Sequence, residues 1–111
     1  MATYQSVFVP ATGIPTTTGA ISTGTAIASA LPFPNNRILA VEPVCTAAAT
    51  TPYAQITFGN SAAMTAATTT GWPVYCGTVA EFDMGQEWSY ISIYNASSAN
   101  MTVYIMELAR S

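Results

Sequence analysis

The side chains that could do acid–base or metal chemistry are few in this sequence. Histidine is absent, and there are only five acidic residues. They are Glu42, Glu81, Asp83, Glu87 and Glu107. Histidine is the commonest general base and the commonest metal ligand, so its absence removes the Ser-His-Asp and Cys-His arrangements of nucleophilic catalysis. The composition therefore argues against most hydrolase and metalloenzyme sites.

Glu81 and Asp83 are the acids whose spacing invites a catalytic interpretation. Two residues apart, they share one face of a continuing strand, and a glycosidase needs such a pair of carboxyl groups. They also lie where a strand runs into Gly85, and solvated acids at strand ends are ordinary. A calcium site that adds Glu87 and loop carbonyls is a further alternative, because calcium takes oxygen ligands. We expect solvated acids, no enzyme activity, no metal and no cofactor.

Cys45 and Cys76 are the only cysteines, and they form no metal-binding motif. Two cysteines near strand ends can lie close together in an all-β fold. A sequence alone does not place their Cα atoms within the ~7 Å that a disulfide requires. A cytosolic protein keeps its thiols reduced. We therefore expect both cysteines to be buried, reduced and structural, and the sequence leaves their pairing open.

The charge content is unusually low. Half of the residues are hydrophobic and 6% are charged, against roughly a quarter in an average soluble domain. The formal net charge is −3, with Arg37 and Arg110 as the only basic residues. This leaves no basic patch for phosphates or anionic lipids, so neither nucleic acid nor a membrane is expected as a partner. So few surface charges favour a protein covered by partners.

The chain divides into two regions of different composition. Residues 1–24 contain prolines, glycines and a run of threonines, which deny a helix and interrupt a sheet ladder, so we expect an extended N-terminal arm. The first residues show neither a basic leader nor an apolar signal block, and a cytosolic product is expected. Residues 25–111 alternate short strand-like runs with turn signals. They predict an all-β fold: a single β-sandwich or jelly-roll-like domain.

Strand-like runs are expected within residues 25–33, 37–44 and 51–60, and then as one extended run over 74–84. Their apolar and β-branched residues are bounded by proline, glycine or asparagine, which is typical of strands. Residues 61–73 are small and polar without a sustained period, and we assign them to a loop.

The last two strands are interpreted as a hairpin around a polar turn at residues 95–100. Ile91 and Ile93 alternate with tyrosines in the first strand, and Val103 and Ile105 flank a tyrosine in the second. Successive side chains of a strand point to opposite faces. With the β-branched residues facing the core, the tyrosines are expected on one outer face, covered by other copies of the chain.

Six aromatic residues are therefore candidates for a subunit or capsid interface, because interfaces are rich in tyrosine and tryptophan. They are Tyr4, Phe8, Trp88, Tyr90, Tyr94 and Tyr104. Two alternatives stay open for the tyrosines. One is ordinary core packing, and the other is an exposed aromatic row that binds sugar, as in a carbohydrate-binding module.

The order of segments resembles a family of small virion proteins of tailed bacteriophages. In that family a strand leads to a segment ending in FG and a small polar residue, then to an Ala/Thr-rich stretch, a strand after a proline and a C-terminal strand pair. The short motif here is Phe58-Gly59-Asn60-Ser61. The matching pieces are NRILAVEPV, YAQITFGNSAAMTAATTTGWPVYCGTVAEF and YISIYNASSANMTVYIMEL.

The resemblance implies a capsid decoration, or cement, protein: a non-enzymatic β-sandwich, often trimeric, that clamps neighbouring capsomers on the capsid surface. Its implied partners are itself, as a homo-oligomer with a trimer favoured, and the major capsid protein. Its implied location is the virion, assembled in the bacterial host cytoplasm. The arm would reach a neighbouring chain by adding a strand to an exposed sheet edge. A phage tail, neck or fibre component is the alternative.

Overall fold

The computed structural model describes residues 8–10, 16–34, 37–48, 52–64 and 71–110. In these ranges the chain forms nine strands, and there is no helix long and apolar enough to cross a membrane. The strands are β1 (Phe8–Pro10), β2 (Thr16–Ile21), β3 (Leu31–Pro32), β4 (Ile38–Cys45), β5 (Tyr53–Gly59), β6 (Trp72–Tyr75), β7 (Ala80–Asp83), β8 (Tyr90–Asn95) and β9 (Met101–Arg110).

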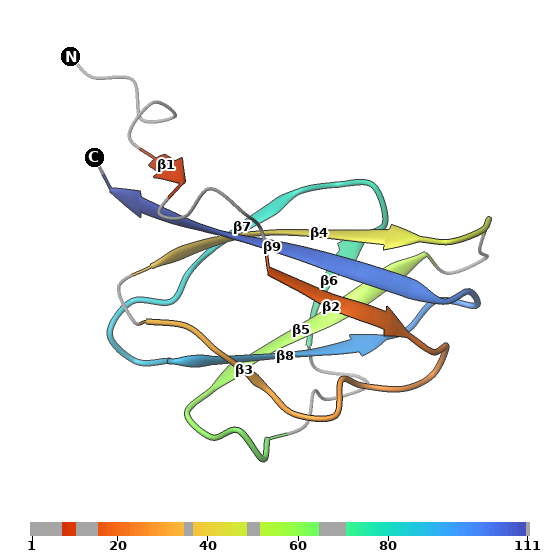
Figure 1. Ribbon diagram of the computed structural model, residues 1–111, viewed down its shortest axis with the longest axis horizontal. Coiled ribbons are helices and arrows are strands. Elements are labelled where there is room, and N and C mark those ends of the chain that lie inside the picture. Colours follow the sequence, from red (N-terminus) through yellow and green to blue (C-terminus); the bar gives the residue numbers. More distant parts are fainter. Residues whose placement is uncertain (1–7, 11–15, 35–36, 49–51, 65–70, 111) are drawn as a thin grey trace.

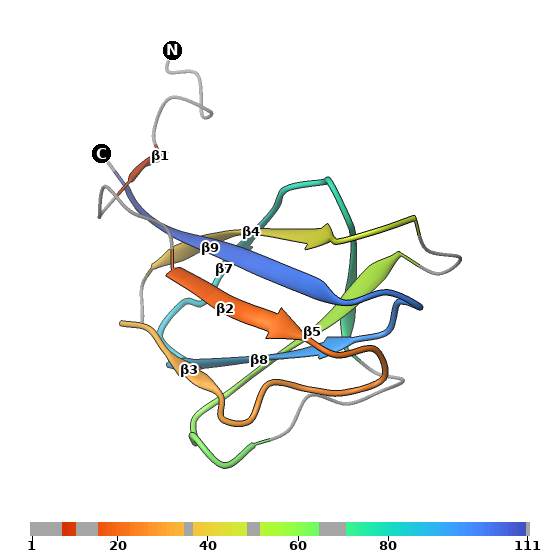
Figure 2. The same cartoon turned by 45° about the vertical axis from the view of Figure 1, so that its right-hand side comes forward.

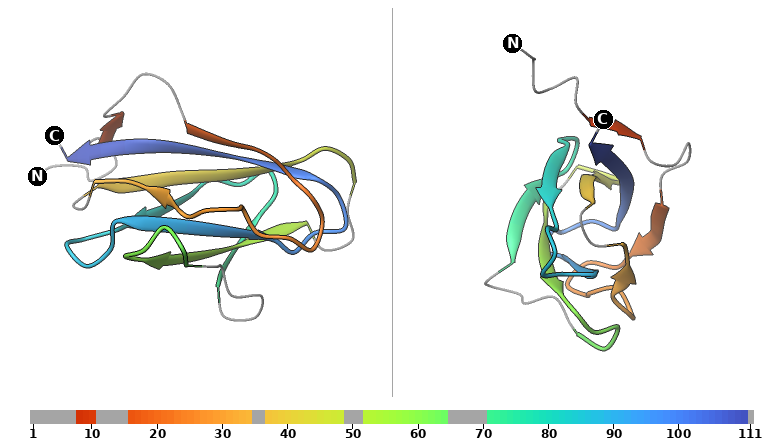
Figure 3. Two further views of the ribbon diagram at one scale, coloured as in Figure 1. Left: turned by 60° about the horizontal axis from the view of Figure 1, so that its bottom comes forward. Right: turned by 90° about the vertical axis from the view of Figure 1, so that its left-hand side faces the viewer.

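The strands form two sheets that pack face to face (Figure 1). Sheet A has the order β1-β9-β4-β7, and β2 also pairs with β9, on the same side as β1. Sheet B has the order β3-β8-β5-β6. The left view of Figure 3 shows the two layers from the side, with β9 and β4 in one and β8 and β5 in the other.

One rule describes the pairing. β2 pairs with β9, β3 with β8, β4 with β7 and β5 with β6, as in a long hairpin whose two arms are rolled up together. Rolling then brings β4 beside β9 and β5 beside β8. Eight strands in two sheets with this order are a jelly roll. The predicted all-β sandwich of jelly-roll type is confirmed.

The inward side chains of both sheets make one hydrophobic core. Among its members that are no more than 2% exposed are Leu39, Val41, Val103 and Ile105 from sheet A and Ile56, Ile91 and Ile93 from sheet B. These residues alternate with more polar or aromatic ones along each strand, as a half-buried strand requires. The predicted inward stripe of Ile91, Ile93, Val103 and Ile105 is confirmed.

The last two strands are not a hairpin, however. β8 pairs with β3 and β5, whereas β9 pairs with β1, β2 and β4. Residues 96–100 therefore carry the chain from sheet B to sheet A, and Figure 2 shows β8 and β9 in separate layers. The two halves of the inward stripe face each other across the core instead of lying side by side on one sheet.

Asn95 explains why the chain crosses between sheets at this point. It is fully buried, and its Nδ2 donates to the carbonyl oxygens of Ile21 and Ala99, each at 2.9 Å. Its Oδ1 accepts a hydrogen bond from the backbone nitrogen of Ser97 at 2.8 Å. The polar turn expected over residues 95–100 is thus a hydrogen-bonded arch.

The extended run expected over 74–84 is also divided between the sheets. β6 ends at Tyr75 in sheet B, and β7 begins at Ala80 in sheet A. Between them Gly77 has φ of 83°, in the left-handed region that glycine adopts readily. Thr78 bonds back to the Tyr75 carbonyl through both its backbone nitrogen and its hydroxyl. The expected single run over 74–84 is therefore wrong, because the turn at Gly77 divides it into two strands.

The segment expected as an arm of residues 1–24 contributes to the sandwich. Residues 1–7 and 11–15 lie outside the described residues. β1 pairs with the C-terminal end of β9, and β2 pairs with its N-terminal half. Ile21, at the end of β2, is 4% exposed and belongs to the core. The sheet therefore includes residues that precede the expected domain start at residue 25.

Candidate functional site

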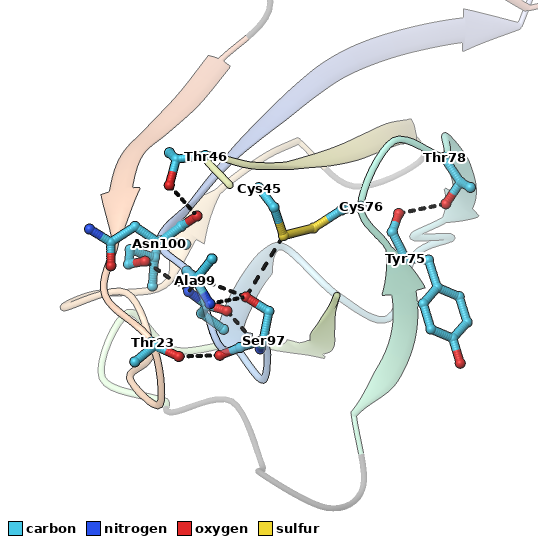
Figure 4. The surroundings of a disulfide bond; sticks show 11 residues. Thr23, Cys45, Thr46, Tyr75, Cys76, Thr78, Ser97, Ala99 and Asn100 are labelled. Atoms are coloured by element: carbon cyan, nitrogen blue, oxygen red, sulfur yellow. Dashed lines mark hydrogen bonds between the residues drawn. A yellow bond between two sulfur atoms is a disulfide. The ribbon is translucent and has the colours of Figure 1, made fainter. Parts of the chain in front are cut away.

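The two cysteines expected to be reduced form a disulfide. Cys45 ends β4 in sheet A, Cys76 directly follows β6 in sheet B, and their Cα atoms are 5.8 Å apart (Figure 4). Next to this bond, the backbone nitrogen of Gly77 donates to the Pro43 carbonyl at 2.8 Å. The expectation of reduced thiols was wrong because it rested only on an assumed cytosolic location. It did not include the packing of the two sheets, which brings the ends of β4 and β6 together. The bond clamps sheet A to sheet B.

A groove lined by residues of the edge strands β6 and β7 lies toward the end of the sandwich where β5 and β7 finish. We call it the side groove, and its volume is about 420 Å³. It is lined by Ile56, Thr57, Phe58, Trp72, Ala80, Glu81, Phe82 and Trp88. The groove exists because β6 begins at Trp72, opposite Ile56, so β6 does not extend alongside the last residues of β5.

Aromatic rings dominate the side groove. Phe58 stacks on Trp88, with ring centroids 5.6 Å apart and ring planes 20° from parallel. Phe82 lies 5.3 Å from Phe58 in a tilted arrangement. Phe58 and Phe82 pack against the core, but Trp88 is 37% exposed and Trp72 is 63% exposed. The groove thus has an aromatic floor supported by the core and two indole rings accessible to solvent.

A second apolar surface lies on the outer face of sheet A, and we call it the sheet A patch. Its residues are Ala40, Glu42, Val79, Tyr104 and Met106. Ala40 is directly opposite Met106, and Glu42 is opposite Tyr104, in the β4–β9 register. Val79 is 59% exposed and Tyr104 is 42% exposed. Glu42 is the only acidic residue among these five, and none of them is basic.

The outer face of sheet B is different, because the chain itself covers part of it. Ser92 and Gln55 alternate with inward residues of β8 and β5, yet they are 0% and 7% exposed. The Gln55 side chain accepts a hydrogen bond from the backbone nitrogen of Gly71 at 3.2 Å. Sheet A therefore presents the more open outer face.

The three tyrosines predicted to share one face are divided between the two outer faces. Tyr104 lies in the sheet A patch, whereas Tyr90 and Tyr94 are half-buried on the outer face of sheet B. The division follows from the arch, since β8 and β9 belong to different sheets. The predicted single tyrosine face is wrong.

The other three predicted interface residues have separate outcomes. Trp88 lines the side groove. The backbone of Phe8 is paired with Arg110 in β1, and its side chain is outside the described part. Tyr4 lies outside the described residues. Met106 lies beside Tyr104 in the sheet A patch, on the outward face that strand alternation predicts for both. Sequence reasoning missed Trp72 and Val79 as surface residues, because their surroundings come from strands distant along the chain.

Glu81 and Asp83 are both exposed in β7. The Asp83 carboxylate accepts a hydrogen bond from the backbone nitrogen of Gly85 at 2.9 Å, which forms the turn after the strand. Within the described residues, no group of three or more His, Cys, Asp or Glu side chains could hold a metal ion. Arg37 and Glu107 form an ion pair at 3.8 Å.

Comparison with known proteins adds no relative: no protein-family model, curated protein or solved structure matches this chain.

Proposed function

We propose that this protein is a non-enzymatic structural protein of a bacteriophage virion that decorates the capsid by self-association and by binding the major capsid protein across capsomers. The observation that carries the proposal is the sheet A patch, an open apolar surface on a jelly roll whose own core is complete without it. The segment pattern around Phe58-Gly59-Asn60-Ser61 supplies the phage context by resemblance.

The size of the patch favours many weak contacts over one strong one. Burying a fully exposed side chain of this kind contributes roughly 1.5–3 kcal/mol. Val79, Tyr104 and Met106 are only partly exposed, so together they offer roughly 2–5 kcal/mol. Association costs an estimated 4–15 kcal/mol. A protein repeated over a symmetric shell overcomes this deficit because each oligomer engages several sites at once.

The sheet edges favour docking through a face. Within the described residues, β3 has two residues including Pro32, and β6 has four including Pro73. β7 carries Glu81 and Asp83, and β2 has a register shift at Gly19, between Thr17 and Ala20. Short strands, prolines, charges and irregularities all discourage edge-to-edge pairing. We therefore assign capsid binding to the face of sheet A and not to a strand added at an edge.

The disulfide fits a protein that works outside the reducing cytosol. Disulfides persist on virion and cell surfaces and are rare in cytosolic proteins. In a decoration protein assembled in the host cytoplasm, the two thiols would form the Cys45–Cys76 bond after the particle is released, by giving up two electrons and two protons to an extracellular oxidant such as dioxygen. This order of events reconciles assembly in the cytoplasm with the clamp between the sheets.

Size-exclusion chromatography with light scattering tests self-association directly. At micromolar concentration the protein is expected to run as an oligomer, with a trimer favoured. Val79→Glu should shift it toward a monomer, because a charge buried in a subunit contact without a partner is costly. Tyr75→Glu is the matched control, since Tyr75 is similarly exposed, at 58%, but lies in sheet B.

A monomer of 11.6 kDa for the unmodified chain would refute self-association. Equal oligomer populations for Val79→Glu and Tyr75→Glu would refute the sheet A patch as the contact surface. Counting copies per particle by quantitative mass spectrometry separates a capsid protein from a tail, neck or fibre component, because a shell carries many more copies.

A further inference from the structure

The side groove presents aromatic surface that the core does not need. Large aromatic rings gain most from burial, yet Trp72 is 63% exposed and Trp88 is 37% exposed on the same groove. Single exposed apolar residues are ordinary, but two exposed indole rings on one hollow form a candidate ligand site. The groove volume of about 420 Å³ falls within the range of small-ligand sites, roughly 300–1,000 Å³.

We propose that the side groove binds a neutral saccharide. A sugar ring has an apolar C–H face and an edge of hydroxyl groups, so its site needs flat aromatic surface with a few hydrogen-bonding groups beside it. The near-parallel stack of Phe58 and Trp88 supplies a flat wall, and Trp72 supplies a second ring. Thr57 and Glu81 are the polar residues of the groove lining, and they supply hydrogen-bonding groups beside the rings.

The charges around the groove select against anionic ligands. Glu81 is the only ionised residue in the lining. Arg37 does not line the groove and is paired with Glu107 at 3.8 Å. A nucleotide, a sulfated glycan or a uronic acid would therefore bring negative charge toward a carboxylate with no compensating cation. A neutral ligand meets no such repulsion.

A saccharide also fits better than an extended peptide. A peptide strand gains affinity by hydrogen bonding along an exposed sheet edge. The edges beside the groove are β6 and β7, each four residues long, and Pro73 in β6 lacks a backbone donor. The groove thus offers more aromatic contact surface than backbone hydrogen-bonding groups. The side groove and the sheet A patch share no lining residue, so saccharide binding and capsid decoration are tested with different variants.

The test uses the full chain with its disulfide intact. A glycan array with neutral and anionic oligosaccharides identifies the best neutral saccharide, which is then titrated while tryptophan fluorescence is recorded. We expect saturable binding with a dissociation constant between about 1 μM and 1 mM. Trp72→Ala should weaken it at least about tenfold, and Trp72→Phe should recover part of the loss because a flat ring remains. Tyr75→Ala, exposed but outside the groove, should bind as the unmodified chain does.

Three outcomes would overturn the proposal. One is the absence of binding to any neutral glycan at about 10 mM, well above the expected dissociation constant. Another is binding confined to anionic glycans. The third is equal affinity for the unmodified chain and Trp72→Ala with both proteins folded by circular dichroism. If an apolar peptide from a displayed library binds through Trp72 where no saccharide does, the groove is a peptide site and the saccharide assignment is wrong.

Discussion

The two ends of the sandwich differ in how the two sheets meet there. At the end where β4, β6 and β8 finish, the disulfide, the buried Asn95 amide and the arch over residues 96–100 connect the sheets to each other. Thr23 also donates its hydroxyl proton to the Ser97 carbonyl there. At the other end, where β5 and β7 finish, the side groove opens between the sheets and is lined by aromatic rings.

The residues that stabilise the fold therefore lie at one end, and the aromatic residues that a ligand could contact lie at the other. At the first end the disulfide and the side-chain hydrogen bonds of Asn95 join parts of the chain to one another. The groove end has an aromatic floor fixed by the core but leaves Trp72 and Trp88 accessible. Substitutions at the first end should therefore change stability, and substitutions at the groove should change binding more than stability.

The disulfide should give the largest effect on stability. Replacing both Cys45 and Cys76 by alanine removes a covalent link between residues 31 apart. The chain-entropy model gives a loss of about 4 kcal/mol in the free energy of unfolding. Urea denaturation followed by circular dichroism measures it. A loss below about 1 kcal/mol would show that the hydrogen-bonded arch alone closes this end.

Asn95→Ala should have the next largest effect. It removes three hydrogen bonds of a fully buried side chain and takes away the acceptor of the buried Ser97 nitrogen, at an expected cost of about 2–4 kcal/mol. Asn100→Ala, at the exposed far end of the same arch, should cost less than about 0.5 kcal/mol. Similar losses for both variants in urea denaturation would contradict the structural role given to the buried amide.

The groove residues should affect stability least. Trp88→Ala loses a ring stacked on Phe58 but already 37% exposed, so we expect about 1–2 kcal/mol. Trp72→Ala should fall within about 0.5 kcal/mol, because most of that side chain is in solvent. Thermal melts of both variants give the order. A larger loss of stability for Trp72→Ala than for Trp88→Ala would mean that Trp72 stabilises the fold. That result would contradict the difference drawn between the two ends.

Local patterns predicted the core far better than they predicted which strands pair. Alternation identified Ile91, Ile93, Val103 and Ile105 as inward residues, because side-chain direction depends only on neighbours along the strand. Alternation does not say whether two successive strands share a sheet. That choice depends on the buried bonds of Asn95, which join parts of the chain distant in sequence.

The same limit explains the errors about the surface. The pairing of Cys45 with Cys76 depends on rolling β4 and β6 into opposing sheets, which no local spacing encodes. The side groove combines β5, β6, β7 and the segment before β8, so only Trp88 was recognised, and Trp72 looked like part of a loop. The low charge content favours a surface covered by partners, but composition does not specify which face of the fold that is.

Cryo-electron microscopy of virions that contain this protein tests the proposed capsid decoration most directly. We predict many symmetry-related jelly rolls on the outside of the capsid, with Val79 and Tyr104 covered by another copy or by the major capsid protein. Virions in which the sheet A patch faces solvent, or in which the protein occupies only a few tail or neck positions, would contradict it.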